Sequence, residues 1–97
     1  MIEDIEIKTE KSDLNIERSI ILIVDDDYSI RSVCKAYLES MGFETHTASS
    51  AGAGLKILNR IRVDLVITNI RMPGMDGLEL TRLIKGRYDS DVIIMTG

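Results

Sequence analysis

The feature that most constrains this chain is an uninterrupted run of aliphatic residues that is followed at once by three aspartates. Residues 20–24 read Ile-Ile-Leu-Ile-Val without any polar alternation, and Asp25, Asp26 and Asp27 come next. A strand that is apolar on both sides has to be buried on both faces, as in the middle of a parallel sheet. The run therefore predicts a central strand whose carboxyl end carries a cluster of carboxylates.

Helical and extended segments alternate along the rest of the chain. Apolar residues recur at helical spacing from Tyr28 to Met41, and Gly42 is suited to end that helix. The pattern predicts helices over 28–41, 51–60 and 77–86, and further strands over 43–47, which should lie at a sheet edge, 63–68 and 92–95. Candidate N-caps are Asp27 or Ser29, Ser49 or Ser50, and Asp76. Alternating strands and helices predict the α/β class, an open, doubly wound parallel sheet with helices on both faces.

Composition limits the classes of protein that remain. The chain has 97 residues, enough for one domain, and its single Cys and single His exclude a disulfide framework and a multi-ligand zinc site. The net charge of −4 argues against nucleic-acid binding by this segment. No apolar run approaches the roughly 20 residues that cross a bilayer. The acidic start is neither a secretory signal nor a transit peptide, so we expect a cytoplasmic protein without membrane contact.

Charge also suggests a boundary within the chain. Residues 1–18 hold six acidic and three basic side chains, whereas residues 19–97 are nearly balanced, with ten acidic and nine basic ones. We therefore expect 1–18 to be an acidic, mobile leader and 19–97 to be the folded domain.

Polar residues stand at the ends of three predicted strands. They are the run Asp25 to Asp27, Asn69 and Thr96. The carboxyl ends of parallel strands share one edge of the sheet, so these side chains should converge. Neighbouring carboxylates repel each other unless a cation is present, and oxygen ligands suit Mg²⁺. The alternative is that the aspartates only cap the following helix.

Three segments, in their order and spacing, resemble the receiver domain of two-component response regulators. They are 21–27 (ILIVDDD), 64–77 (DLVITNIRMPGMDG) and 92–97 (VIIMTG), and the resemblance covers about residues 19–97. The resemblance implies a flavodoxin-like sheet with strand order 2-1-3-4-5. Pro73 and Gly77 match residues that shape the exit from the third strand.

The resemblance also implies a site. Asp25 and Asp26 match the acidic pair that holds Mg²⁺, and the backbone carbonyl of Arg71 is a further ligand of that ion. Thr96 matches the hydroxyl residue that contacts the phosphoryl group and moves on activation. Asn69 falls where the family has its phospho-accepting aspartate, and its amide oxygen offers the metal a neutral ligand.

Asn69 is the chief departure from the family pattern. An amide oxygen is much less nucleophilic than a carboxylate, so we expect no ordinary aspartyl phosphate. The lost charge should also weaken Mg²⁺ binding. Asn69 is either a natural feature of a phosphorylation-independent receiver or an engineered block, and the otherwise intact Asp25, Asp26 and Thr96 fit both origins.

Length is the second departure. The family continues beyond the fourth strand with a fourth helix, a fifth strand and a fifth helix, and we expect this chain to lack them. The strand at 92–95 would then be an open sheet edge, and a patch around Val33 and Tyr37 would be exposed. Self-association through that edge would be one consequence. The alternative is that the natural protein runs on, with an output domain to follow.

The function that these features favour is a receiver module that switches signalling rather than an enzyme. Its expected partner is a sensor histidine kinase or a phosphotransfer protein. Asp25 and Asp27 also resemble the first motif of haloacid-dehalogenase-like phosphohydrolases, but the later lysine and acidic pair of that family are missing. A purely structural dimerisation domain is the third alternative.

Overall fold

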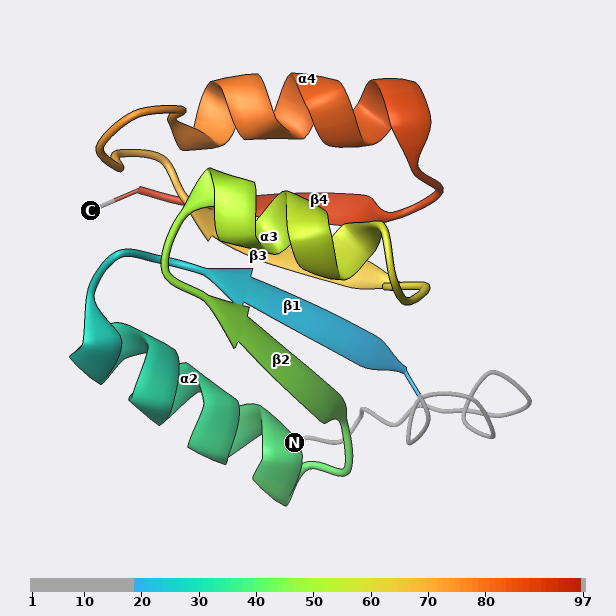
Figure 1. Cartoon of the computed structure of the whole chain (residues 1–97). Coiled ribbons are helices and arrows are strands. Elements are labelled where there is room, and N and C mark those ends of the chain that lie inside the picture. The colour runs from blue at the N-terminus through green and yellow to red at the C-terminus, as the bar shows by residue number, and fades with distance from the viewer. Residues whose placement is uncertain (1–18, 97) are drawn as a thin grey trace.

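The computed structural model describes residues 19–96, which form one parallel sheet with three helices (Figure 1). The strands are β1 (Ile20–Val24), β2 (Glu44–Ala48), β3 (Leu65–Asn69) and β4 (Asp91–Met95). The helices are α2 (Tyr28–Ser40), α3 (Ala51–Leu58) and α4 (Gly77–Arg87). The strand order is β2-β1-β3-β4, and each pair of neighbours is parallel. This confirms the predicted α/β, flavodoxin-like fold.

Two expectations from the sequence concern the termini and the membrane. The acidic leader predicted for residues 1–18 lies outside the described residues. Within the described part of the chain, the longest helix, α2, has 13 residues, and none of the helices there could cross a membrane.

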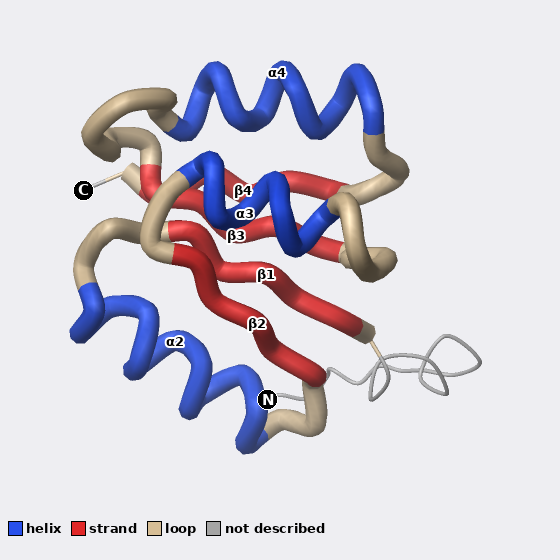
Figure 2. Tube along the Cα trace, viewed as in Figure 1, coloured by secondary structure: helices blue, strands red, loops and turns tan. Residues whose placement is uncertain are grey.

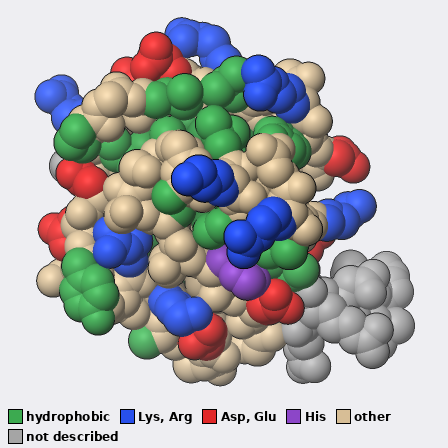
Figure 3. Space-filling view, viewed as in Figure 1, with side chains coloured by type: hydrophobic (Ala, Val, Ile, Leu, Met, Phe, Trp, Pro, Cys, Tyr) green, Lys and Arg blue, Asp and Glu red, His purple; other side chains and the backbone are tan. Residues whose placement is uncertain are grey.

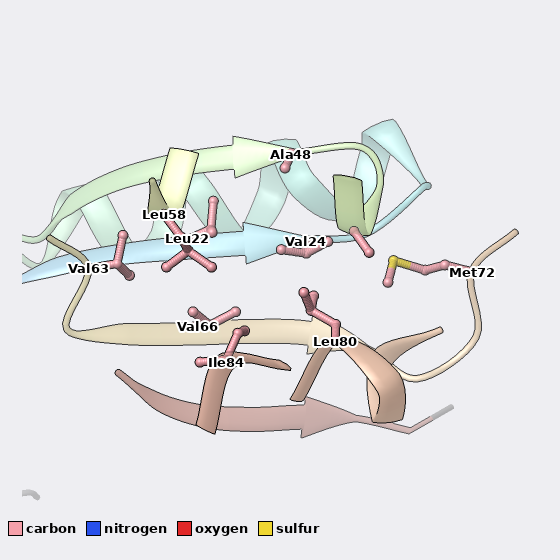
Figure 4. Close-up of a cluster of buried hydrophobic side chains, with 10 residues drawn as sticks. Leu22, Val24, Ala48, Leu58, Val63, Val66, Met72, Leu80 and Ile84 are labelled. Carbon is pink, nitrogen blue, oxygen red and sulfur yellow. The ribbon is translucent and has the colours of Figure 1, made fainter. Parts of the chain in front are cut away.

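The hydrophobic core lies between the sheet and helices α3 and α4, while α2 covers the opposite face beside β1 and β2 (Figure 2). Leu22 and Val24 of β1 point into this core, and Ile21 and Ile23 point to the side of α2. All four are buried, which confirms that β1 is a central strand with two covered faces. Figure 4 shows the core cluster, whose buried members are Leu22, Val24, Ala48, Ala51, Leu58, Val63, Val66, Met72, Leu80 and Ile84.

The helices begin at capping residues that the sequence contains. Asp27 caps α2, and its carboxylate accepts hydrogen bonds from the Ser29 and Ile30 N–H groups at 2.8 and 3.3 Å. Ser50 caps α3, so the structure selects one of the two candidates at each of these starts. Asp76 caps α4 in a reciprocal capping box, in which the Glu79 N–H donates to Asp76 Oδ1 at 2.9 Å and the Asp76 N–H donates to Glu79 Oε1 at 3.2 Å.

Strand boundaries differ slightly from the prediction. β2 and β3 begin one and two residues later than expected and each end one residue later, so that Asn69 is the last residue of β3 rather than the residue after it. Just before β3, the Asp64 carboxylate accepts the Ile20 N–H at 2.8 Å, and the Asp64 N–H donates to the Ile20 carbonyl at 2.9 Å. β2 lies at an edge of the sheet, as its mixed polarity predicts.

Large apolar side chains remain exposed on the α2 side of the domain. Val33 and Tyr37 on α2 are 69% and 65% exposed, and Ile93 on β4 is 52% exposed. The exposed patch around Val33 and Tyr37 is therefore confirmed. Figure 3 shows a face on which several basic side chains and some hydrophobic ones are exposed, with acidic side chains mostly near its rim. His46 lies on this face, and its Nε2 is 2.7 Å from Glu44 Oε2.

The turn from β3 into α4 brings two backbone segments unusually close. The Gly77 N–H donates to the Ile70 carbonyl at 2.9 Å, and the Ile70 N–H donates to the Met95 carbonyl at 3.1 Å. A Cβ on Gly77 would lie 2.2 Å from the Asn69 carbonyl oxygen. Only glycine fits at this point, so the start of α4 is held directly against the end of β3.

Two leucines of α4 test the core. Leu80 is fully buried and Leu78 is 43% exposed, so the same truncation has different costs at the two positions. We expect Leu80→Ala to lower the free energy of unfolding by about 2–5 kcal/mol, because it leaves a cavity, and Leu78→Ala to lower it by less than about 1 kcal/mol. Urea unfolding followed by circular dichroism measures both. Equal losses would contradict the assigned core.

Two glycines of α4 test the close approach to β3. Gly77→Ala should destabilise the domain by about 1–3 kcal/mol, because the new methyl group meets rigid backbone. Gly86→Ala is the matched control, since its Cβ would meet nothing within 4 Å, and it should stabilise α4 by about 0.5–1 kcal/mol. Thermal unfolding of the two variants should therefore shift in opposite directions, and a neutral Gly77→Ala would show that the turn is not tight.

Candidate functional site

The carboxyl ends of β1, β3 and β4 meet at one edge of the sheet and enclose a small cavity. Asp25 follows β1 directly, Asn69 ends β3, and Thr96 follows β4. These three side chains line a cavity of about 270 Å³ together with Ile30 and Met95. The sequence predicts that the polar strand ends converge, and the topology brings them together as expected.

Asp25 is the most buried polar group of the site. It is 1% exposed, and its Oδ1 accepts the Asp27 N–H at 2.9 Å. Its Oδ2 is buried and has no hydrogen-bond partner among the described residues. A buried carboxylate oxygen without a donor costs free energy, so this position favours a cation or a water molecule as neighbour.

The other two aspartates of the run have separate roles. Asp27 is committed to capping α2. Asp26 is exposed and faces a neighbouring cavity of about 650 Å³, which is also lined by Ile70, Arg71, Met72, Pro73, Asp76 and Leu78. The cap and the site are therefore not alternatives, because Asp27 serves the helix and Asp25 and Asp26 remain for the site.

The Asn69 side chain turns its amide nitrogen toward the acceptors of the site. Nδ2 donates to the backbone carbonyl of Arg71 at 3.0 Å and to Asp25 Oδ1 at 3.5 Å. Thr68, the preceding residue, is buried and its hydroxyl donates to the Asn69 carbonyl at 3.0 Å. Thr68 is therefore not placed to replace Asn69 in the cavity.

Arg31 is a residue of the site that the sequence did not reveal. Its Nη1 donates to the Asp25 carbonyl at 2.7 Å, and its guanidinium lies 5.6 Å from the ring centroid of Tyr28. The contact braces the turn between β1 and α2. One basic residue in the first turns of a helix carries no specific sequence signal, since such residues are common on solvated helix faces. Tyr28 itself is exposed and lies outside the cavity of Asp25.

The groups around the cavity fit a divalent cation only in part. The carboxylates of Asp25 and Asp26 and the Arg71 carbonyl are hard oxygen donors, and the unpartnered Asp25 Oδ2 suits a cation. The Asn69 carboxamide does not fit as oriented, because it directs N–H groups rather than its oxygen at Asp25 and Arg71. The described residues also contain no cluster of three or more His, Cys, Asp or Glu side chains that could hold a metal.

Comparison with known proteins identifies the family of this chain. The family model of the response regulator receiver domain matches residues 21–97. The heme response regulator HssR of Staphylococcus haemolyticus is 41% identical over 75 residues, which are 77% of this chain and 34% of that protein. HssR of Staphylococcus aureus is 39% identical over the same shares. The chain thus spans about a third of the length of these curated relatives.

Solved structures that are similar to this chain are also response regulators or their receiver domains. The response regulator receiver domain protein from Clostridium thermocellum has a TM-score of 0.77 and 39% identity, and the match covers 81% of this chain and 65% of that one. The response regulator TrrA of Thermotoga maritima, solved in complex with Mg²⁺ and BeF, has a TM-score of 0.73 and 38% identity, with 80% and 69% covered. The parallel sheet, the acidic residues after β1 and these matches agree, and the chain belongs to the response regulator receiver domain family.

Proposed function

We propose that this chain acts as the receiver module of a two-component regulator and that Asn69 prevents its ordinary phosphorylation. The observation that supports this most strongly is the position of Asn69. It ends β3, shares a cavity with Asp25 and Thr96, and stands where the family has its phospho-accepting aspartate. The module would bind partners and switch between states without turning over a substrate.

The chemistry of the carboxamide is the reason for the block. Phosphoryl transfer to a receiver needs a carboxylate oxygen that attacks phosphorus while the donor group leaves. The amide oxygen of Asn69 is neutral, its electrons are delocalised toward nitrogen, and Nδ2 faces the carboxylate of Asp25. Buried Thr68 offers no substitute. The Thr96 hydroxyl lines the cavity and would contact a phosphoryl group only if one were formed.

The proposed partners and location follow from the family. Sensor histidine kinases and phosphotransfer proteins engage receivers around the acidic site, so the surface near Asp26 and Arg71 is the expected contact. We propose a cytoplasmic location and Mg²⁺ binding that is weakened by Asn69. The relatives named HssR are heme response regulators.

The phosphohydrolase alternative loses its general acid. In that reading Asp25 would be the nucleophile and Asp27 the acid. Asp27 instead accepts the Ser29 and Ile30 N–H groups as the cap of α2. Its carboxylate is therefore held in the helix start, and we do not propose hydrolase activity.

Phosphorylation of a restored acceptor tests the proposal. The Asn69→Asp variant would be incubated with Mg²⁺ and acetyl phosphate, both as the full chain and fused to the remaining receiver elements of the Clostridium thermocellum domain. We expect the fused variant to gain one phosphoryl group by intact mass as acetate leaves, and the fused wild-type sequence to gain none.

Two controls make the phosphorylation result specific. Asn59→Asp makes the same chemical change at the end of α3, away from the site, and should add no phosphoryl group. Adding Asp25→Asn to the Asn69→Asp fusion should abolish the gain. A fused Asn69→Asp protein that folds normally and stays unmodified would overturn the proposed function.

Self-association is a second candidate role, favoured by the edge strand. Asp91 and Met95 direct their backbone groups to the β3 side, so Val92 and Ile94 direct theirs to the outer edge of the described sheet. Exposed Ile93 lies on the same strand. We propose that a second copy of this chain pairs there, which would cover both the open edge and the apolar side chain.

The oligomeric state tests this second role. Sedimentation equilibrium should show concentration-dependent dimers for the full chain and monomers for Ile93→Glu, because a charge at the contact opposes association. Leu78→Glu changes an exposed apolar residue on α4 instead and should leave the dimer intact. A monomeric full chain that unfolds cooperatively would contradict self-association.

A further inference from the structure

The Asn69 carboxamide lies between two acceptors that belong to different segments of the chain. Asp25 contributes a buried carboxylate, and Arg71 contributes its backbone carbonyl after β3 has ended. The two hydrogen bonds from Nδ2, at 3.5 and 3.0 Å, are as many as one amide nitrogen can donate. One side chain therefore joins the end of β1 to the loop after β3.

We infer that the two N–H groups of Asn69 take the place of the divalent cation, so that the end of β1 and the loop after β3 close on each other without a metal. This inference deepens the proposed function and rests on it for the identity of the two acceptors as cation ligands. The amide carries partial positive charge on its hydrogens, and it directs that charge at the groups that would otherwise require an ion. Asn69 thus replaces the metal structurally, in addition to removing the nucleophilic carboxylate.

The charge of the side chain at residue 69 determines whether Asp25 and the Arg71 carbonyl need a cation between them. A carboxylate at residue 69 would place a third acceptor beside the Asp25 carboxylate and the Arg71 carbonyl, and three acceptors repel one another. The carboxamide of the same shape reverses the interaction, because it donates where the carboxylate could only accept. Two attractive contacts then stand in place of two repulsive ones, and the loop is held to β1 in the absence of metal.

A cation would have to undo these contacts in order to bind. The Asn69 amide would rotate so that its oxygen faced the ion, and both hydrogen bonds from Nδ2 would be lost. The buried Asp25 Oδ2 has no partner among the described residues, so that oxygen is still without a donor or a cation when Asn69 occupies Oδ1. The barrier to metal is therefore competition by the amide as well as the loss of one negative charge.

This competition makes a prediction that charge loss alone does not make. If Asn69 only removes a charge and still serves as an oxygen ligand, Asn69→Ala binds Mg²⁺ no better than the wild type. If the amide competes with the ion, Asn69→Ala binds Mg²⁺ more tightly, by about tenfold, which corresponds to the loss of one ordinary hydrogen bond. Asn69→Asp removes the competition and restores the charge, so it should bind most tightly.

Calorimetric titration of the full chain with Mg²⁺ tests the order Asn69→Asp, then Asn69→Ala, then wild type. Asn59→Ala, an exposed asparagine at the end of α3, is the control and should match the wild type. Wild-type affinity equal to or above that of Asn69→Ala would overturn the inference. The phosphorylation of Asn69→Asp can succeed or fail independently of this order, so the two proposals are separately testable.

Thermal stability gives a second readout that does not need the alanine variant to fold. Millimolar Mg²⁺ should raise the unfolding midpoint of Asn69→Asp and leave the wild-type midpoint unchanged, because in the wild type the Asn69 amide already joins Asp25 to the loop after β3. Without Mg²⁺, Asn69→Asp should unfold at a lower temperature than the wild type. A wild-type midpoint that rises with Mg²⁺ as much as that of the variant would contradict the replacement.

Discussion

The burial of β1 on both faces is the constraint on which the rest of this structure depends. Each of its two faces needs a cover, and the chain supplies α3 and α4 for one and α2 for the other. A strand covered in this way has to sit inside the sheet, between β2 and β3. Its next residue, Asp25, is then carried into the interior, where a carboxylate is stable only with partners.

The site follows from the way in which that carboxylate is accommodated. The Asp27 N–H donates a hydrogen bond to Asp25 Oδ1, and the Arg31 guanidinium donates one to the Asp25 backbone carbonyl. The Asn69 amide approaches the same carboxylate from the end of the adjacent strand. Gly77 allows α4 to start against the Asn69 carbonyl, so the loop after β3 has little room to move away. In this arrangement a single change from carboxylate to carboxamide alters both the nucleophile and the forces that hold the loop.

Much of this architecture could be predicted from the sequence, because it depends on patterns that extend over whole elements. The apolar run of β1, the helical spacing after Tyr28 and the glycines at turns predict the element order and the sheet, and they predict that Asp25, Asn69 and Thr96 share an edge. The sequence did not predict which aspartate of the run would cap α2 and which would remain at the site. Whether Asp27 or Ser29 caps α2 depends on local backbone angles rather than on residue type.

The orientation of the Asn69 amide was also beyond the sequence. Oxygen and nitrogen of a carboxamide have the same shape, so only the surrounding donors and acceptors decide which one faces Asp25. The role of Arg31 is similar, since it comes from a single contact to a backbone carbonyl. The limits of β2 and β3 also differ from the prediction by one or two residues, because an apolar pattern does not specify the residue at which strand pairing begins.

The measurement that tests the metal-free closure most directly is NMR of the Asn69 side-chain amide in ¹⁵N-labelled protein, with its signal assigned by its absence from Asn69→Asp. A signal that exchanges slowly with solvent and does not move on addition of millimolar Mg²⁺ is expected, since both N–H groups are hydrogen-bonded. Exposed Asn59 provides the fast-exchanging reference in the same spectrum. An Asn69 signal that exchanges as fast as that of Asn59 and shifts with Mg²⁺ would contradict the closure.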